Sequence, residues 1–254
     1  MRNTLYILIV DDDQRMAKTL KDIFNIKGYE AEVTHSGHDA LKMVVKDDFD
    51  LVLTDIKMPR MNGVELCRKM RESRPHIPIL LMTAYSTDIL VKEGLEEGAV
   101  IALHKPLDLE SLLDLFSSLR KERSVVIADN DYEFCSTLGN ILRTRDFAVT
   151  HVTDPQSVTE SIKSDSHVVL LDMNLDVTSS LMVLERIRER YFHLPVILMT
   201  AHQDEIKESI DAAFKIGAYT CLYKPFHIKE LFQFLTEIRH KEMKRVLKEA
   251  AMRR

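Results

Sequence analysis

Residues 51–59 read LVLTDIKMP, and residues 168–176 read VVLLDMNLD. Three further pairs of segments match in the same order: IVDDD (9–13) with IADND (127–131), IPILLMTAYS (77–86) with LPVILMTAHQ (194–203), and GAVIALHKPLDLESL (98–112) with GAYTCLYKPFHIKEL (217–231). The separation between matched segments is nearly constant, which indicates two tandem copies of one domain. We predict domains at 1–121 and 122–238, followed by a basic helical extension at 239–254.

Composition excludes several classes of protein. The 254-residue chain is 45% hydrophobic and 30% charged, as expected for a globular protein with two domains. Its net charge of -5 gives no global attraction to nucleic acid or anionic membranes. Apolar runs have the length of strands, far short of a membrane span, and the start lacks a signal-peptide pattern. Three scattered cysteines, Cys67, Cys135 and Cys221, fit a reducing compartment, so we expect a cytoplasmic protein.

Short runs rich in Val, Ile and Leu alternate with amphipathic segments of helical length in each copy. In the first copy, strands are expected at roughly 5–10, 30–34, 50–54, 78–82 and 100–103. This alternation predicts an α/β fold with a parallel sheet covered by helices on both faces. Ligands of such sheets bind at the carboxyl ends of the strands, so the residues just beyond each strand are candidates for a site.

In the first copy those residues are Asp11, Asp12, Asp55, Thr83 and Lys105. Converging carboxylates repel one another unless a divalent cation lies among them, and oxygen ligands suit Mg²⁺ or Mn²⁺. A nearby hydroxyl and ammonium can bind the oxygens of a phosphoryl group. The combination predicts a carboxylate nucleophile that forms an aspartyl phosphate.

The acidic pair, TDIKMP, MTA and HKP, in this order and spacing, resemble the receiver domain of bacterial two-component response regulators. The resemblance covers essentially the whole chain, once per copy. It implies flavodoxin-like (βα)₅ domains with strand order 2-1-3-4-5 and cis bonds before Pro106 and Pro225. It also implies that Asp55 is the phosphoacceptor, that Asp11, Asp12, Asp55 and the Lys57 carbonyl hold Mg²⁺, and that Thr83 and Lys105 sense the phosphoryl group.

Two departures from the family pattern concern the first site. Ala102 stands where family members usually carry the aromatic switch residue, so the usual coupling of Thr to an aromatic ring is in doubt. Lys57 and Tyr85 match positions that flank the path of attacking water in the family. Because both side chains are bulky, we expect slow self-dephosphorylation.

The second copy retains Asp129, Asp172, Thr200 and Lys224 as counterparts of the first site, so Asp172 is a candidate second phosphoacceptor. Asn130 replaces the second acid and Asn174 follows Asp172 by two. We therefore expect a weak metal site with at least tenfold lower Mg²⁺ affinity. Cys221 replaces the switch aromatic. The loop MPRMNG (58–63) becomes LDVTSS (175–180), with Ser180 suited to a helix N-cap. The second copy is either a weakened receiver or a module retained for docking or dimerisation.

The extension at 239–254 carries an apolar stripe at Met243, Val246, Leu247 and Ala250 on a basic helix. It is either a solvated extension or a dimerisation surface, and direct nucleic-acid binding is not expected. The expected partners are a sensor histidine kinase or histidine phosphotransfer protein and a downstream effector protein. The alternative function is a phosphate-independent adaptor. A turnover phosphohydrolase of the haloacid-dehalogenase kind is disfavoured, because it needs an acid at the position of Lys57 or Asn174.

Overall fold

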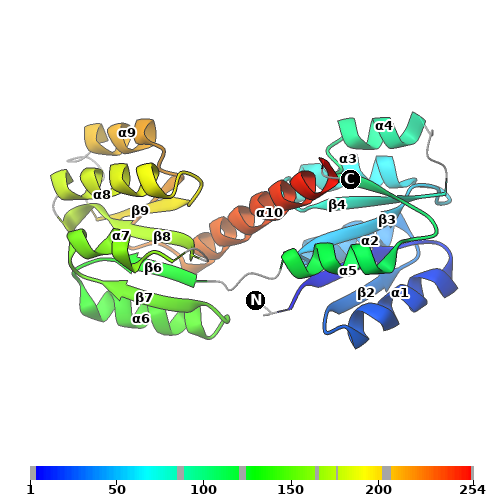
Figure 1. The fold of residues 1–254 in the computed structure, drawn as a ribbon, viewed down its shortest axis with the longest axis horizontal. Coiled ribbons are helices and arrows are strands. Elements are labelled where there is room, and N and C mark those ends of the chain that lie inside the picture. Colours follow the sequence, from blue (N-terminus) through cyan, green and yellow to red (C-terminus); the bar gives the residue numbers. More distant parts are fainter. Residues whose placement is uncertain are drawn as a thin grey trace. The chain divides into compact units, whose positions relative to one another are not determined.

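The computed structural model describes residues 4–84, 89–119, 124–163, 166–175, 177–201 and 207–252. By its internal contacts the chain divides into two compact units. The first unit comprises Arg2–Arg120 together with Glu237–Arg254, and the second comprises Lys121–Thr236. Each unit carries a five-stranded parallel sheet with helices on both faces (Figure 1).

The first unit confirms the expected alternation and strand order, with its sheet arranged β2-β1-β3-β4-β5. Every neighbouring pair of strands is parallel. The elements are β1 (Tyr6–Val10), α1 (Gln14–Ile26), β2 (Glu30–Thr34), α2 (Gly37–Lys46), β3 (Leu51–Asp55), α3 (Gly63–Ser73), β4 (Ile79–Thr83), α4 (Ile89–Glu96), β5 (Ile101–His104) and α5 (Leu109–Ser118).

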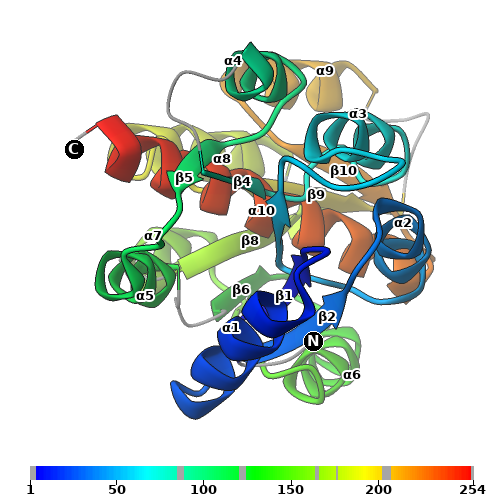
Figure 2. The same cartoon turned by 90° about the vertical axis from the view of Figure 1, so that its right-hand side faces the viewer.

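Two apolar clusters fill the first unit, one on each face of the sheet. Helices α1 and α5 bury Leu20, Phe24 and Phe116 against one face, whereas α2 and α3 bury Val44 and Cys67 against the other (Figure 2). Strands β3 and β4 are buried along their whole length, as expected for central parallel strands covered on both sides.

The second unit repeats this topology, with its sheet arranged β7-β6-β8-β9-β10. Helices α7, α8 and α9 pack on one face of that sheet around Val169 and Leu198. The elements are β6 (Ser124–Ala128), α6 (Tyr132–Arg143), β7 (Ala148–Val152), a 3₁₀ turn η1 (Pro155–Ser157), α7 (Val158–Ser161), β8 (Ser166–Asp172), a 3₁₀ turn η2 (Met173–Leu175), α8 (Val177–Arg190), β9 (Val196–Thr200), α9 (Lys207–Ile216) and β10 (Thr220–Tyr223). Both Lys-Pro bonds, before Pro106 and Pro225, are cis.

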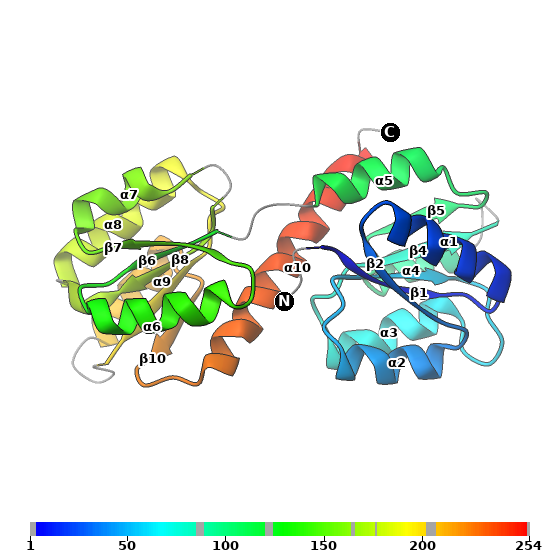
Figure 3. The same cartoon turned by 90° about the horizontal axis from the view of Figure 1, so that it is seen from below.

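The last helix, α10 (Ile228–Met252), contributes to both units (Figure 3). Its residues up to Thr236 belong to the second unit, where the ring of His167 lies 3.5 Å from the Leu235 carbonyl. From Glu237 onward it belongs to the first unit, and Met243 and Leu247 are buried in the cluster that contains Phe116. The predicted apolar stripe is therefore covered by the core of the first unit. The sequence had suggested either a solvated extension or a dimerisation surface, and neither describes this arrangement.

A polar anchor fastens this part of α10 to the first unit. Arg239 Nη2 lies 2.9 Å from the Asp50 carboxylate, which also accepts the Tyr6 backbone N–H at 2.9 Å. His240 Nε2 lies 3.1 Å from the Phe49 carbonyl oxygen. The neutral ring donates this hydrogen bond when its hydrogen is on Nε2. Burial raises the pKa of Asp50 to about 6 and lowers the pKa of His240 to about 3. The helix is thus joined to the start of β3 by a buried ion pair and a neutral imidazole.

Candidate functional site

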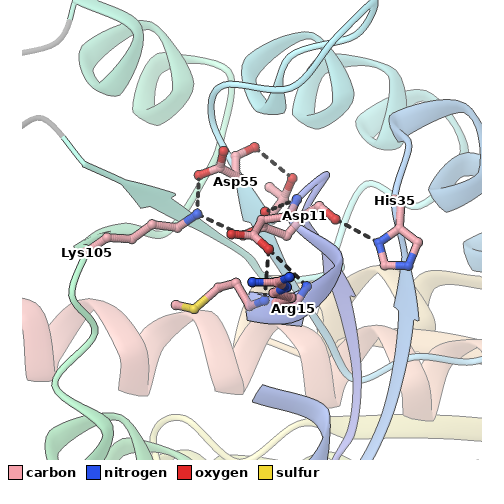
Figure 4. A network of polar contacts seen from close by, with 8 residues as sticks. Asp11, Arg15, His35, Asp55 and Lys105 are labelled. Carbon is pink, nitrogen blue, oxygen red and sulfur yellow. Dashed lines mark hydrogen bonds and ion pairs between the residues drawn. The ribbon is translucent and has the colours of Figure 1, made fainter. Parts of the chain in front are cut away.

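The ends of four parallel strands bring the predicted site residues of the first unit together. Asp11 follows β1, Asp55 ends β3, Thr83 ends β4 and Lys105 follows β5. Because β1, β3, β4 and β5 run in one direction and are neighbours in the sheet, these ends share one edge. Figure 4 shows Asp11, Asp55 and Lys105 pointing toward one another at this edge.

Lys105 lies between two carboxylates. Its Nζ is 2.8 Å from Asp11 Oδ2 and 2.8 Å from Asp55 Oδ1. Asp11 Oδ1 accepts the Asp13 backbone N–H at 2.9 Å, and His35 Nδ1 lies 2.9 Å from the Asp11 carbonyl oxygen (Figure 4). Asp11 is thereby fixed through its carboxylate and its backbone, as a pre-organised ligand requires.

The residues present fit a divalent metal ion. Among the described residues, Asp11, Asp12 and Asp55 offer carboxylate oxygens that all lie within 4.8 Å of one another. Asp11 and Asp55 are buried, whereas Asp12 is exposed. Three carboxylates against the single ammonium of Lys105 leave two uncompensated negative charges, which match the charge of Mg²⁺ or Mn²⁺.

The electrostatics of Asp55 distinguish it from an ordinary surface carboxylate. Burial raises the pKa of Asp55, and Asp11 and Asp12 act in the same direction, while Lys105 opposes them. For Lys105, burial acts to lower the pKa, but hydrogen bonds to Asp11 and Asp55 outweigh it and the net pKa is raised. A buried carboxylate whose pKa is raised by neighbouring carboxylates, and which lies next to a fixed ammonium, is a candidate nucleophile.

Gly63 determines how closely the loop after β3 returns to the site. Its backbone N–H donates to the Ile56 carbonyl at 2.8 Å, and a Cβ at this position would lie 2.4 Å from the Asp55 carbonyl oxygen. Helix α3 therefore begins at a residue that has no side chain because the Asp55 backbone fills the space.

Gly63→Ala is expected to lower the free energy of unfolding of the first unit by about 1–3 kcal/mol, because backbone atoms cannot move aside for the added methyl. Urea unfolding followed by hydrogen exchange of peptides from that unit measures the change. The matched control is Gly139→Ala in α6, where the methyl is crowded by the flexible end of Arg143 and is in ordinary contact with the Val149 side chain. For Gly139→Ala we expect the free energy of unfolding to change by no more than about 1 kcal/mol. Equal losses in the two variants would contradict the conclusion that the Asp55 backbone leaves no room for a side chain at Gly63.

The second unit brings Asp129, Asp172 and Lys224 together in the same way. Lys224 Nζ lies 2.6 Å from Asp129 Oδ2 and 3.3 Å from Asp172 Oδ1. Burial raises the pKa of Asp172, and the Asn174 backbone N–H donates to its carboxylate. Thr200 is buried at the end of β9, matching the position of Thr83.

Ser180 occupies the position of Gly63 but does not cap a helix, so that prediction was wrong. Helix α8 already begins at Val177, after the 3₁₀ turn η2 that directly follows Asp172. The buried Ser180 hydroxyl donates to the Asp172 carbonyl at 2.9 Å. Ser180 therefore lies inside α8, and its hydroxyl contacts the Asp172 backbone, which Gly63 approaches without a side chain in the first unit.

The remaining predicted residues lie near the sites. The Lys57 side chain is exposed two residues beyond Asp55. Ala102 and Cys221 lie on β5 and β10, each packed against the apolar cluster of its unit. Burial raises the pKa of the Cys221 thiol to about 11, as expected for an unreactive core cysteine. Tyr85 lies outside the described residues.

Sequence reasoning missed two aromatic residues at the second site. Phe134 and Phe226 contact each other with ring centroids 6.0 Å apart, and Lys224 Nζ lies over the Phe134 ring at 4.4 Å from its centroid. Met16 and Leu107 stand at the matching positions of the first copy. Comparing the copies residue by residue around each lysine would have found this difference.

Comparisons with known proteins agree with the fold and identify the family. The model of the response regulator receiver domain family matches twice, at residues 7–117 and 125–236. The chain therefore belongs to the response regulator receiver family and carries two receiver domains.

This chain is similar in sequence to response regulators from several bacteria. A response regulator receiver protein of Anaeromyxobacter sp. (strain Fw109-5) is 29% identical over 85% of this chain and 94% of its own length. The response regulator MprA of Mycobacterium ulcerans is 39% identical over 107 residues, and these make up 42% of this chain and 46% of that protein. Among solved structures, the chemotaxis response regulator CheY4 of Vibrio cholerae is 30% identical, with a TM-score of 0.42 over 45% of this chain and 98% of that chain. Within the described residues, no helix is long and apolar enough to cross a membrane.

Proposed function

We propose that this chain is a two-component response regulator in which Asp55 accepts a phosphoryl group from a phosphohistidine donor. The donor is a sensor histidine kinase or a histidine phosphotransfer protein. The observation that carries the proposal is the convergence of Asp55 with Asp11, Asp12 and Lys105 at one sheet edge, with Lys105 within 2.8 Å of both Asp11 and Asp55. We infer a cytoplasmic protein that acts through contacts with a downstream effector protein, not by substrate turnover.

In the proposed step, a carboxylate oxygen of Asp55 forms a bond to phosphorus as the bond from phosphorus to the donor's histidine nitrogen breaks. The electron pair of the broken bond leaves with the imidazole. Asp11, Asp12, Asp55 and the Lys57 carbonyl would hold Mg²⁺ or Mn²⁺, which neutralises charge on the phosphoryl oxygens. Lys105 is already within reach of the acceptor carboxylate, and Thr83 at the neighbouring strand end is suited to bind a further oxygen. The exposed Lys57 beside this path is consistent with slow self-dephosphorylation.

The second receiver domain has two candidate roles. Asp172 with Lys224 retains the acceptor and the ammonium, which supports a weakened phosphoacceptor. The early start of α8 and the loss of the second acid at Asn130 favour a module that binds a partner or a second copy. A phosphate-independent adaptor built from receiver folds remains the second candidate function for the whole chain.

Asp55→Asn is expected to abolish phosphoryl incorporation, because an amide cannot replace the carboxylate nucleophile. The full-length protein is incubated with Mg²⁺ and a small-molecule phosphodonor such as acetyl phosphate, and the incorporated phosphoryl groups are counted by intact mass. The wild type should gain one group, and Asp172→Asn, the matched variant in the second domain, should gain one as well. Incorporation in Asp55→Asn at the wild-type level would overturn the proposal.

A further inference from the structure

The second site differs from the first in the number of its carboxylates and in their accessibility. Among the described residues that match the first site, the carboxylates are those of Asp129 and Asp172, since Asn130 replaces the exposed acid of the first site. The Asp129 side chain is fully buried and the Asp172 side chain is 3% exposed, compared with 12% for Asp55. Two carboxylates and one ammonium leave a single negative charge, so a divalent cation would leave the site with excess positive charge. The donor set does not fit the metal ion that suits the first site.

Lys224 lies between the two carboxylates, as Lys105 does in the first unit, but it also lies over an aromatic ring. Its Nζ lies 2.6 Å from Asp129 and 3.3 Å from Asp172, and the Phe134 ring covers it with the centroid 4.4 Å away. An ammonium over the face of an aromatic ring is attracted by the negative charge density of that face. Phe226, which directly follows the cis Pro225, meets the Phe134 ring edge to face. The ammonium is thus held by two carboxylates and one aromatic face.

In the first unit, the residue that matches Phe134 is Met16, and Lys105 lies 2.8 Å from both Asp11 and Asp55. A thioether lacks the ring's charge distribution, so Lys105 can move toward an incoming phosphoryl oxygen without losing such a contact. In the second unit, any cation that approaches Asp129 has to displace Lys224 from both the carboxylate and the ring.

We propose that Phe134, backed by Phe226, locks Lys224 onto Asp129 and Asp172 in place of a metal ion. The second receiver domain then keeps one conformation without Mg²⁺ or a phosphoryl group. The aromatic lock adds to the missing charge at Asn130, so restoring an acid there by itself restores only weak metal binding. The proposal rests on the chain being a receiver protein, but it does not depend on phosphoryl transfer to Asp55.

Mn²⁺ binding to the full-length protein, followed by electron paramagnetic resonance, tests the lock without any phosphodonor. The wild type should bind one ion, and Asp11→Asn, which removes a first-site ligand, should abolish that binding. Asn130→Asp should bind the second ion weakly. Asn130→Asp combined with Phe134→Met, the residue of the first copy, should bind it at least tenfold more tightly than Asn130→Asp alone. Phe134 is only half-buried, so its replacement is compatible with folding, and Phe134→Leu provides a second variant.

The matched control combines Asn130→Asp with Phe214→Met, which alters an exposed phenylalanine on α9 and should leave the second-ion affinity of Asn130→Asp unchanged. Equal affinities in Asn130→Asp with and without Phe134→Met would overturn the lock. Two ions of similar affinity in the wild type would overturn it as well. Because binding to the first site is measured in the same titration, failure of the lock is distinguishable from failure of the proposed function.

Discussion

Arg239→Leu is expected to lower the free energy of unfolding of the first unit by about 3–5 kcal/mol at about pH 9, because it leaves a buried carboxylate without its counter-ion. Asp50 is 8% exposed, and Arg239 Nη2 at 2.9 Å is its ion-pair partner on α10. The pKa of Asp50 is already raised to about 6 by burial, with Arg239 opposing the shift. Without the guanidinium this pKa should rise further, so the loss should shrink in acid, where Asp50 is neutral. Urea unfolding followed by hydrogen exchange of first-unit peptides measures the loss.

Two further variants separate the ion pair from a general effect of changing α10. Asp50→Asn combined with Arg239→Leu removes both charges and should recover a large part of the loss, as a double-mutant cycle would detect. Arg245→Leu removes an exposed arginine of the same helix, whose partner Glu249 is also at the surface. We expect about 1 kcal/mol or less for that change. A similar loss in Arg239→Leu and Arg245→Leu would contradict a buried anchor.

His240→Gln is expected to make the first unit more resistant to acid than the wild type. Burial lowers the pKa of His240 to about 3, whereas the unfolded chain binds a proton near pH 6.5. Below about pH 6.5 the unfolded state therefore binds more protons at this histidine, and the contribution of His240 to stability falls by about 1.4 kcal/mol per pH unit until about pH 3. Gln removes this loss and keeps a donor for the Phe49 carbonyl.

The difference between variant and wild type is the quantity to measure, because Asp50 acts in the opposite direction. Its folded pKa of about 6 lies above its unfolded value of 3.8, so its contribution falls as pH rises between these values. The two slopes nearly cancel in the wild type from about pH 6 to 4. Stability of His240→Gln relative to the wild type should rise by about 3 kcal/mol from pH 6.5 to 4. His76→Gln, at a partly exposed histidine, is the control, and a flat difference for His240→Gln would refute the argument.

The sequence was sufficient to predict the sheets and the first site because both depend on local and repeated signals. Buried apolar runs followed by acidic residues predict parallel strands and their functional ends, and the structure brings Asp11, Asp12 and Asp55 together at one edge. Lys105 was a candidate because it directly follows the fifth expected strand, and the second copy has Lys224 at the matching position. The order of the strands came from the resemblance to receiver domains, and both sheets have it.

The polar anchor of α10 and the aromatic lock could not be predicted because each joins residues far apart in the chain. The spacing of Met243 and Leu247 predicts an apolar helix face but does not say which surface covers it. Arg239 lies in a basic segment where solvated charges are the ordinary expectation. Phe134 fits any amphipathic helix, and its role depends on Lys224, which reaches it only through the fold.

The division of α10 between the units has a consequence for biosynthesis. The first unit is discontinuous in sequence, because its core includes Met243 and Leu247, which the ribosome adds after the entire second unit. At translation rates of about 5–20 residues per second, the nascent first domain spends seconds with that part of its apolar surface uncovered. The N-terminal domain is therefore the last to be completed, and a nascent chain that stops before Glu237 cannot finish it.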